Sequence, residues 1–460
     1  MVIGMRNPDH GSERRSSPLK IFCLVLLAAI CAGCRGFMYT SGRAEGLPEI
    51  PGDLDFGGAD VYFYDWWSAD ARAEEPTDEQ QLQYDYWDEL EAACNVKVHQ
   101  VALSDWEGNP AVLAEMVMNG DDSRLCVVGI STGFAGAALA NNLFMPWTYG
   151  LDRGVFNDAA VDFMTRNGVC YGVTWGSAVE PRQGVFFNKR ILEDANIDWN
   201  ELYDLQAAGK WTWDKMEEYM DKVQRNAGVE GNPEVYALTG NADDVTIALV
   251  VSNGADFYDF NEQGELVPAI DTENMREALS RRIAWDNQYM RPAVQWNDYQ
   301  KFWADGTVAF MIGQSYEGFN GNGTDNQVAD EWGFVAVPMG PKADHYTSAA
   351  EDNVFGIPNV YDEETSLKLQ QLFTLWISPV PGSDEDSWAS PFYPLTDERA
   401  IEETYAMLRR NENATIMKFN LIGDRNSAIT EITRNLYGGS VDQIISDALE
   451  AFRQRCDKFN

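Results

Sequence analysis

Residues 60–65 read DVYFYD, residues 96–101 read VKVHQV and residues 125–130 read LCVVGI. Apolar, β-branched and aromatic residues dominate all three stretches, which is typical of strands that are largely buried. Each stretch is also short, as strands in globular proteins usually are. We therefore predict one strand at each of these places.

The segments between these strands carry helical signals. Thr77 can cap a helix with its hydroxyl, and Gln80 three residues later completes a capping box. Apolar residues then recur at helical spacing from Leu82 to Ala93, and residues 109–119 form a second helical stretch. Strand and helix thus alternate as β-α-β-α-β, which predicts an α/β fold with a parallel sheet covered by helices.

A second α/β region follows farther along the chain. It opens with a strand at residues 185–187 and contains a strong helix from Thr212 to about Arg225. The 460 residues suggest two or three domains at roughly 150 residues per domain. No Ser-, Gly- or Pro-rich linker separates the two regions. We therefore expect two α/β lobes that share several crossings of the chain.

The composition excludes several classes of protein. A hydrophobic content of 45% is that of a globular chain, which excludes disordered and collagen-like proteins. The 73 acidic side chains outnumber the 34 basic ones, and the formal net charge is −39. Such a charge excludes binding to nucleic acid through phosphate neutralisation and argues against adhesion to anionic lipid. The 15 Trp, 19 Tyr and 22 Phe residues provide an unusually large stock of flat apolar faces.

The N-terminus has the layout of a secretory signal. Basic residues precede an apolar run from Ile21 to Ala32, which is too short for a membrane-spanning helix. The junction Ala32-Gly33-Cys34 resembles a bacterial lipobox, in which the cysteine becomes the lipidated first residue of the mature protein. An ordinary signal peptide is the alternative interpretation. We expect Cys34 to carry lipid.

Cysteine and histidine usage limits the possible cofactor sites. The cysteines after Cys34 are too few for a disulfide scaffold, and Cys126 and Cys170 lie in apolar stretches that fit buried thiols. Whether any pair is bridged stays open. No C-x-x-C motif occurs and the two later histidines are His99 and His345, so we expect no transition-metal site and no cofactor. The cysteines concerned are Cys94, Cys126, Cys170 and Cys456.

The string GISTG at residues 129–133 matches the G-x-S-x-G pattern of serine hydrolases. It follows a predicted strand and precedes a stretch of small residues at 134–141, which is the context that a nucleophilic Ser131 needs. The histidine that such an enzyme requires would have to be His99 or His345, and neither fits the usual order of the three catalytic residues. The other interpretation is a turn that presents N–H groups and hydroxyls to a ligand at the carboxyl edge of a sheet.

Five short motifs follow one another along the chain. They are GVTW (172–175), GVFFNK (184–189), WTWDKM (211–216), FWADGTVAFM (302–311) and WGFVAVP (332–338). Together with the lipobox, they resemble the bacterial extracellular solute-binding proteins that serve ATP-driven importers, and in particular the sugar-binding family 1. The chain departs from the pattern in two places. The strand at CVV lacks the usual Asp, and a Thr-Trp pair in GVTW replaces the usual proline.

This resemblance implies a two-lobed periplasmic-binding-protein-like fold of type II. A ligand cleft would lie between the lobes, and three hinge crossings would connect them near Tyr171, Pro338 and Pro394. The implied division of the chain is 1–33 as signal peptide, 34–47 as lipid-anchored tether, 48–170 with 338–393 as N-lobe, and 171–337 with 394–460 as C-lobe.

A cleft of this kind suits a sugar physically. The apolar C–H face of a sugar ring stacks on Trp or Tyr, and its hydroxyls need carboxylate, amide and backbone partners. Residues at the expected strand ends and crossings can fill both roles, although those after the first strand fit a core equally well. Trp211 and Trp213, at a helix start, are expected to pack. The candidate ligand-binding residues are Asp65, Trp66, Trp67, Ser131, Thr132, Phe134, Trp175, Glu180, Asn253, Tyr316, Glu351, Asp352 and Asn353.

The resemblance and the residues together predict a lipid-anchored, extracytoplasmic and monomeric substrate-binding subunit. It would capture a carbohydrate and deliver it to ABC permease subunits in the membrane, without catalysis of its own. Two alternatives stay open, namely a secreted serine hydrolase built on Ser131 and a surface sensing or adhesion lipoprotein of the same fold. The identity of the sugar and its chain length also stay open.

Overall fold

The structure is a computed structural model of the chain, which divides into the units Met1–Leu47 and Pro48–Asn460. Nearly all the described residues belong to the second unit. Among them, no helix combines the length and the apolar character that crossing a membrane requires. The structure describes residues 47–178, 180–224, 235–318, 328, 330–350, 353–383, 396–423, 425–436 and 438–460.

The first sheet has the strand order β13-β3-β1-β2. Val61 of β1 pairs with Val98 of β2 and with Leu125 of β3, both in parallel, whereas β13 runs antiparallel to β3. The parallel sheet and the three strands predicted from the sequence are thereby confirmed. The strands are β1 (Ala59–Asp65), β2 (Val96–Ala102), β3 (Leu125–Ser131) and β13 (Asn353–Gly356), and a small hairpin is formed by β4 (Thr165–Arg166) and β5 (Val169–Cys170).

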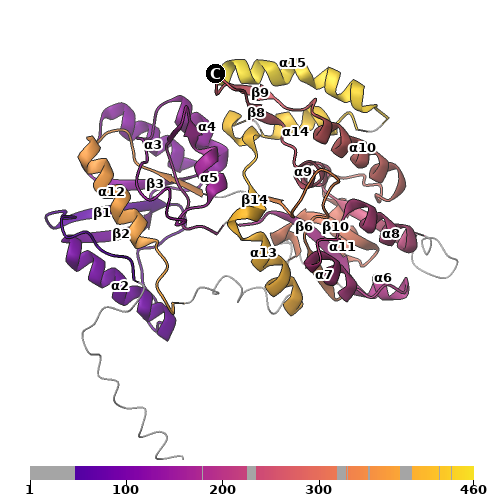
Figure 1. The fold of residues 1–460 in the computed structure, drawn as a ribbon, viewed down its shortest axis with the longest axis horizontal. Coiled ribbons are helices and arrows are strands. Elements are labelled where there is room, and N and C mark those ends of the chain that lie inside the picture. Colours follow the sequence, from indigo (N-terminus) through magenta and orange to yellow (C-terminus); the bar gives the residue numbers. More distant parts are fainter. Residues whose placement is uncertain are drawn as a thin grey trace, which may run out of the picture. The chain divides into compact units, whose positions relative to one another are not determined.

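Helices from distant parts of the chain cover the first sheet. In Figure 1 the orange helix α12 lies among the indigo and purple elements of this sheet, and the rings of Trp376 in α12 and Trp87 in α2 stack at 4.5 Å. The predicted capping box is present, because Thr77 and Gln80 exchange two hydrogen bonds of 3.1 Å at the start of α2. The helices are α2 (Asp78–Cys94), α3 (Gly108–Asn119), α4 (Thr132–Ala140), α5 (Asp158–Phe163) and α12 (Glu363–Trp376).

The second sheet has the order β11-β6-β10-β7, in which β10 is parallel to β7 and antiparallel to β6. Two glycines make room for rings on the neighbouring strand: a Cβ on Gly184 would lie 2.1 Å from the Phe334 ring, and one on Gly333 would lie 2.2 Å from the Phe187 ring. The strands of this sheet are β6 (Gln183–Asn188), β7 (Tyr236–Gly240), β10 (Val308–Gln314) and β11 (Trp332–Val335). The helices in the same part of the chain are α6 (Lys189–Asp194), α7 (Asn200–Ala207), α8 (Trp213–Gln224), α9 (Ala242–Ser252), α10 (Glu273–Gln288), α11 (Asp298–Ala304) and the short η1 (Ser315–Gly318).

Trp211 and Trp213 are fully buried next to this sheet, which confirms that they pack. The remaining elements are β8 (Tyr258–Phe260), β9 (Leu266–Pro268), β12 (Ser348–Ala349), η3 (Ala400–Tyr405), α13 (Ala406–Leu408), η4 (Asn411–Asn413), β14 (Ala414–Thr415), η5 (Lys418–Ile422), α14 (Arg425–Thr433) and α15 (Val441–Phe459). α15 packs against β9, as Figure 1 also shows.

Short backbone pairings accompany the passage of the chain between the two sheets. Val173, which precedes β6, pairs with Phe355 in β13 of the first sheet. Pro181 pairs with Ala350, and β12 pairs with β14. The crossing predicted near Pro394 lies outside the described residues. The exact boundaries of the two lobes stay a prediction.

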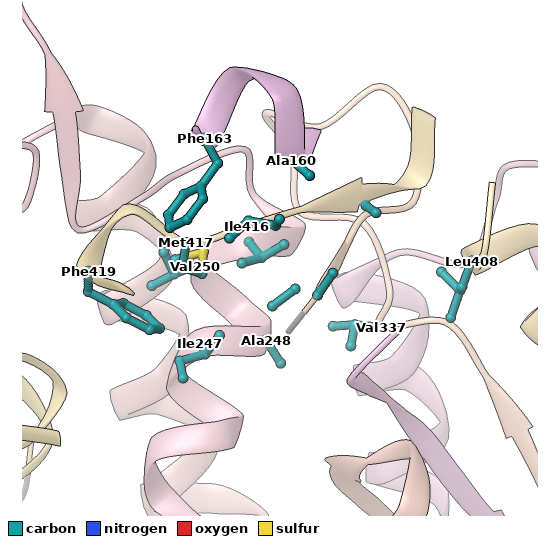
Figure 2. Close-up of a cluster of buried hydrophobic side chains, with 14 of the residues drawn as sticks. Ala160, Phe163, Ile247, Ala248, Val250, Val337, Leu408, Ile416, Met417 and Phe419 are labelled. Carbon is teal, nitrogen blue, oxygen red and sulfur yellow. The ribbon is translucent and has the colours of Figure 1, made fainter. Parts of the chain in front are cut away.

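An apolar cluster joins segments that are far apart in the sequence. Figure 2 shows Phe163 of α5, Val250 of α9 and Met417 close together, with Phe419 of η5 beside them. All four side chains are 5% exposed or less. The core therefore joins α5 and α9 to the C-terminal part of the chain.

The four cysteines in the described part of the chain are buried and carry free thiols. Burial raises the pKa of the Cys126 thiol to about 11, so this group stays protonated at neutral pH. The prediction that Cys126 and Cys170 are buried thiols is confirmed.

Helix α4 touches η5 at its backbone. A Cβ on Gly136 would lie 1.5 Å from the carbonyl oxygen of Leu421, so the two segments meet where α4 has no side chain. Gly133, one turn earlier on the same helix, has more room, because a Cβ there would meet nothing closer than the Ser131 Oγ at 3.9 Å. The contact between α4 and η5 therefore requires a glycine at position 136 but not at position 133.

Gly136→Ala should lower the free energy of unfolding by about 2 kcal/mol or more, because the new methyl group meets backbone that cannot turn away. Gly133→Ala is the matched control. It should be neutral or stabilise the protein by up to about 1 kcal/mol through helix propensity. Chemical denaturation of both variants measures the difference. Equal stability of the two variants would contradict the close packing of α4 on η5.

His99 holds the segment after β1 against the edge strand β2. Its Nδ1 lies 2.8 Å from Asp70 and its Nε2 lies 3.1 Å from Asp60. The backbone N–H of Asp70 also donates to the carbonyl of Gln100 in β2 at 2.9 Å. The hydrogen bond to Asp70, followed by that to Asp60, raises the pKa of His99. The protonated imidazole is therefore the form that this contact favours.

This ion pair predicts a pH-dependent contribution to stability. A histidine whose pKa is raised on folding contributes fully below its unfolded pKa of about 6.5, and the contribution is lost as the pH rises through the folded value. The free energy of unfolding of the wild type should therefore exceed that of His99→Gln by more at pH 5.5 than at pH 9. Urea denaturation of both proteins at the two pH values checks this. A difference that is constant or grows with pH would contradict the prediction.

Candidate functional site

The strands of the first sheet end at a common edge. Because β1, β2 and β3 are parallel, the chain leaves them on the same side, at Asp65, Ala102 and Ser131. The carboxyl ends of parallel strands are where α/β proteins usually bind ligands. We call this side the first edge.

The carboxylate of Asp65 is fully buried and engaged in the turn that follows β1. Its Oδ1 accepts hydrogen bonds from the backbone N–H groups of Trp67 at 2.9 Å and Ser68 at 2.8 Å, and its Oδ2 accepts one from the Ser68 hydroxyl at 2.6 Å. Asp65 therefore positions the two tryptophans that follow it, rather than offering an open carboxylate to a ligand.

Two pairs of aromatic rings lie on the first edge. Trp66 and Trp67 are perpendicular with ring centroids 4.7 Å apart, and Trp106 packs against Phe134 at 4.9 Å. Trp67 is 50% exposed and Trp106 is 47% exposed. Large aromatic side chains are normally buried, so two half-exposed indoles beside the same strand ends indicate a surface for a ligand.

Trp106 was missed in the sequence analysis. It lies in the irregular segment between β2 and α3, where no periodicity draws attention to it. Its place just after the second parallel strand could have identified it, since the residues after the first and third strands were considered. Asn109 was also missed. Its Nδ2 donates to the carbonyls of Asp65 at 3.0 Å and Gly129 at 3.2 Å and so joins the ends of β1 and β3.

The other residues predicted after β3 have different environments. Ser131 is half-buried and caps α4, with its Oγ accepting from the N–H of Gly133 at 3.4 Å. Thr132 is fully buried, and its Oγ1 has no hydrogen-bond partner within the described structure. Asn353 begins β13 and pairs in register with Ser131, which places its backbone at the first edge.

The second sheet has a corresponding edge, where the parallel strands β7 and β10 end. We call it the second edge. Tyr316 lies here in η1, directly after β10. The neighbouring Glu317 accepts a hydrogen bond from the N–H of Gln314 at 2.8 Å and another from the hydroxyl of Tyr299. The backbone that carries Tyr316 is thus tied to both β10 and α11.

Three further candidates have structural contacts of their own. Trp175 packs between the rings of Phe355 and Phe373, each at 5.4 Å. Glu180 is exposed and lies 3.7 Å from Arg409. Asn253 is fully buried at the end of α9, where its Nδ2 donates to a carbonyl of the next helix at 2.9 Å. The predicted residues Cys34, Glu351 and Asp352 lie outside the described part of the chain.

The two histidines that a hydrolase would need contact aspartates. Both ring nitrogens of His99, on the edge strand β2, face carboxylates, which belong to Asp60 and Asp70. Nδ1 of His345 lies 2.5 Å from its neighbour Asp344. The Ser131 hydroxyl contacts backbone. Within the described ranges, no three or more His, Cys, Asp or Glu side chains are grouped so that they could hold a metal ion.

A cavity of about 440 Å³ lies beside β2 and borders the segment that follows the Asp65 turn. It is lined by residues 68–72, by residues 97–100 of β2, and by aromatic side chains of α2 and α12. The charged groups at its rim pair with other side chains of the chain, as in Arg72 with Asp88 and Lys97 with Glu91, both at 2.8 Å. This internal pairing makes the cavity a weaker candidate for a ligand than the first edge.

Comparisons with known proteins agree with the fold. A sequence model described as bacterial extracellular solute-binding protein matches residues 85–400. None of the curated proteins is similar enough in sequence to match. Solved structures do match. One of them is a cyclic alpha-maltosyl-1,6-maltose binding protein from Arthrobacter globiformis, which is 14% identical in sequence. The match covers 87% of this chain and 99% of that one, with a TM-score of 0.59.

Two other solved structures are similar over comparable lengths. UspC of M. tuberculosis has 15% identity, covers 86% of this chain and 100% of its own, and gives a TM-score of 0.60. The sugar-binding protein MalE from the phytopathogen Xanthomonas citri has 13% identity, covers 87% and 98%, and gives a TM-score of 0.57. These likenesses show the two-lobed fold of type II periplasmic binding proteins. With the family model matching most of its length, the chain belongs to the bacterial extracellular solute-binding proteins.

Proposed function

We propose that this protein is the carbohydrate-binding subunit of an ABC importer, which captures a mono- or oligosaccharide and delivers it to permease subunits in the membrane. The observation that carries the proposal is the first edge, where Trp67 and Trp106 are half-exposed in two separate aromatic pairs. An edge of this kind has the chemistry that a sugar ring requires, because its C–H faces stack on indole rings.

The hydroxyls of the sugar would find their partners around these rings. Ser131 and Asn353 lie opposite each other in register at the first edge and supply a hydroxyl and an amide. Backbone N–H groups at the start of α4 add donors. The structural neighbours include proteins described as binding a cyclic maltose derivative and as sugar-binding, which supports the same class of ligand.

In this proposal the two edges face each other across the cleft of the fold. The N-lobe comprises residues 48–170 and 338–393, and the C-lobe comprises residues 171–337 and 394–460. The first sheet supports this division, because it takes three strands from residues 59–131 and β13 from residues 353–356. Tyr316, Trp175 and Glu180 then contribute from the C-lobe and the hinge. The protein acts as a monomer and without catalysis.

The protein acts outside the cytoplasm, as its family does, and we propose that lipid on Cys34 holds it at the cell membrane. The support is the Ala32-Gly33-Cys34 junction after a short apolar run. A sensing role for the same fold would use the same cleft. Deletion of the permease genes that the proposal requires separates the two roles, because it should abolish uptake and leave sensing.

Trp67→Ala and Trp106→Ala should each weaken sugar binding about ten-fold, because each removes a stacking face worth about 0.5–1.5 kcal/mol beyond the buried area. A thermal-shift screen of mono- and oligosaccharides first identifies a ligand, since a ligand at 100 times its Kd adds about 2.7 kcal/mol of stability. Isothermal titration calorimetry of the variants with that ligand then gives the affinities.

Trp213→Ala is the control for this experiment. Trp213 is fully buried and donates to the Ser252 hydroxyl at 3.1 Å, so its loss should lower the melting temperature. The affinity of the folded fraction should stay the same. Wild-type affinity in both edge variants would remove the first edge from the site.

Cys34→Ala should move the protein from the membrane fraction to the soluble fraction of its host. The reason is that membrane attachment through lipid requires acyl chains on this cysteine, and more than one chain is needed for a stable anchor. Fractionation followed by immunoblotting measures the change. A variant that stays in the membrane fraction would show that something other than a lipidated Cys34 holds the protein there.

A further inference from the structure

Trp296 is the most exposed tryptophan in the described part of the chain. It lies in the segment between α10 and α11 and is 75% exposed, and its neighbour Val294 is 90% exposed. An indole that is exposed to water does not contribute to folding the free energy that burial of its apolar surface would give. The exposure of Trp296 makes this side chain a candidate for contact with a ligand.

The backbone places this segment at the second edge. Met290 bridges to Leu238 in parallel with β7, and the N–H of Arg291 donates to the carbonyl of Leu238 at 2.8 Å. The chain therefore runs alongside β7 in the same direction. Continued in this direction, residues 292–297 lead toward the ends of β7 and β10, and the hydrogen bond from Tyr299 to Glu317 also places the start of α11 there.

The segment is also fixed in place. Asp298, the first residue of α11, accepts hydrogen bonds from the N–H groups of Val294 at 2.7 Å and Gln295 at 2.8 Å, and these bonds lower the pKa of its carboxyl. At the other end, the guanidinium of Arg291 stacks 3.9 Å above the Phe302 ring. Trp296 thus lies in a turn that is closed by the Asp298 carboxylate and flanked by the contact of Arg291 with Phe302.

A further contact joins this turn to the predicted stacking residue. The hydroxyl of Tyr299, in the first turn of α11, donates to the carboxylate of Glu317, which follows Tyr316 directly in η1. Trp296 lies three residues before Tyr299. The segment that carries Trp296 and the backbone of Tyr316 are therefore connected through α11.

We propose that Trp296 is a stacking surface for a second sugar ring, so that the ligand is an oligosaccharide of two or more units. The inference rests on the proposed function and adds the length of the ligand to it. A pyranose ring has two faces and can stack on two aromatic surfaces. The described edges already offer three, namely the Trp66–Trp67 pair, the Trp106–Phe134 pair and Trp296. A single ring leaves at least one of them uncovered.

The test is calorimetric titration of the full mature protein with saccharides of one to four units from α-glucan, β-glucan, xylan and mannan. The wild type should bind a member with two or more units at least ten-fold more tightly than the matching monosaccharide. Trp296→Ala should weaken binding of the longer sugar about ten-fold and leave that of the monosaccharide within two-fold. Trp296→Phe should lose less, because it keeps a ring face.

Val294→Ala is the matched control, since it shortens a still more exposed side chain on the same turn and should change neither affinity. Equal affinity of Trp296→Ala and wild type for the longer sugar would overturn the inference and leave the proposed function standing. So would a wild type that binds the monosaccharide as tightly as its oligomers. Absence of binding to every sugar in the panel would overturn the proposed function and this inference together.

Discussion

The Asp65 carboxylate, buried at the end of β1, accepts three hydrogen bonds from the two residues that follow Trp66. A buried polar group is tolerated when it is hydrogen-bonded, so this turn has little freedom to take another shape. The carbonyl of Ser68 then accepts the N–H of Ala102 at the end of β2. One acidic side chain thereby fixes the direction in which Trp66 and Trp67 leave the sheet and holds that exit against the neighbouring strand.

Asn109 extends the same constraint to the third strand. Its amide group donates to carbonyls at the ends of β1 and β3, and it stands in the first turn of α3. Trp106 precedes it by three residues, so the anchoring of α3 also sets where this indole can lie. The two aromatic pairs of the first edge are therefore held by buried polar groups behind them. Stacking surfaces fixed in this way bind with a smaller loss of conformational freedom than mobile ones.

The sequence was most informative where a pattern repeats. The strands at 60–65, 96–101 and 125–130, the capping box at Thr77 and the burial of Trp213 follow from periodicity and local chemistry, and the structure confirms them. Trp106 and Trp296 lie in irregular segments, where exposure depends on tertiary packing that a single sequence does not express. The use of Asp65 within its own turn was equally hidden, because its hydrogen-bond partners are backbone groups.

The strong acidity of the chain and its aromatic edges are compatible because stacking does not depend on charge. A net charge of −39 repels anionic ligands at a distance, whereas a neutral saccharide experiences no such force. The groups that carry the proposal at the first edge are aromatic rings, an amide, a hydroxyl and backbone, and the buried Asp65 carboxylate is engaged in its own turn. For the proposed carbohydrate ligand, this long-range repulsion disfavours uronic acids relative to neutral sugars. The net charge of the chain then contributes to selectivity at a distance, separately from the contacts that the side chains of the site make with the ligand.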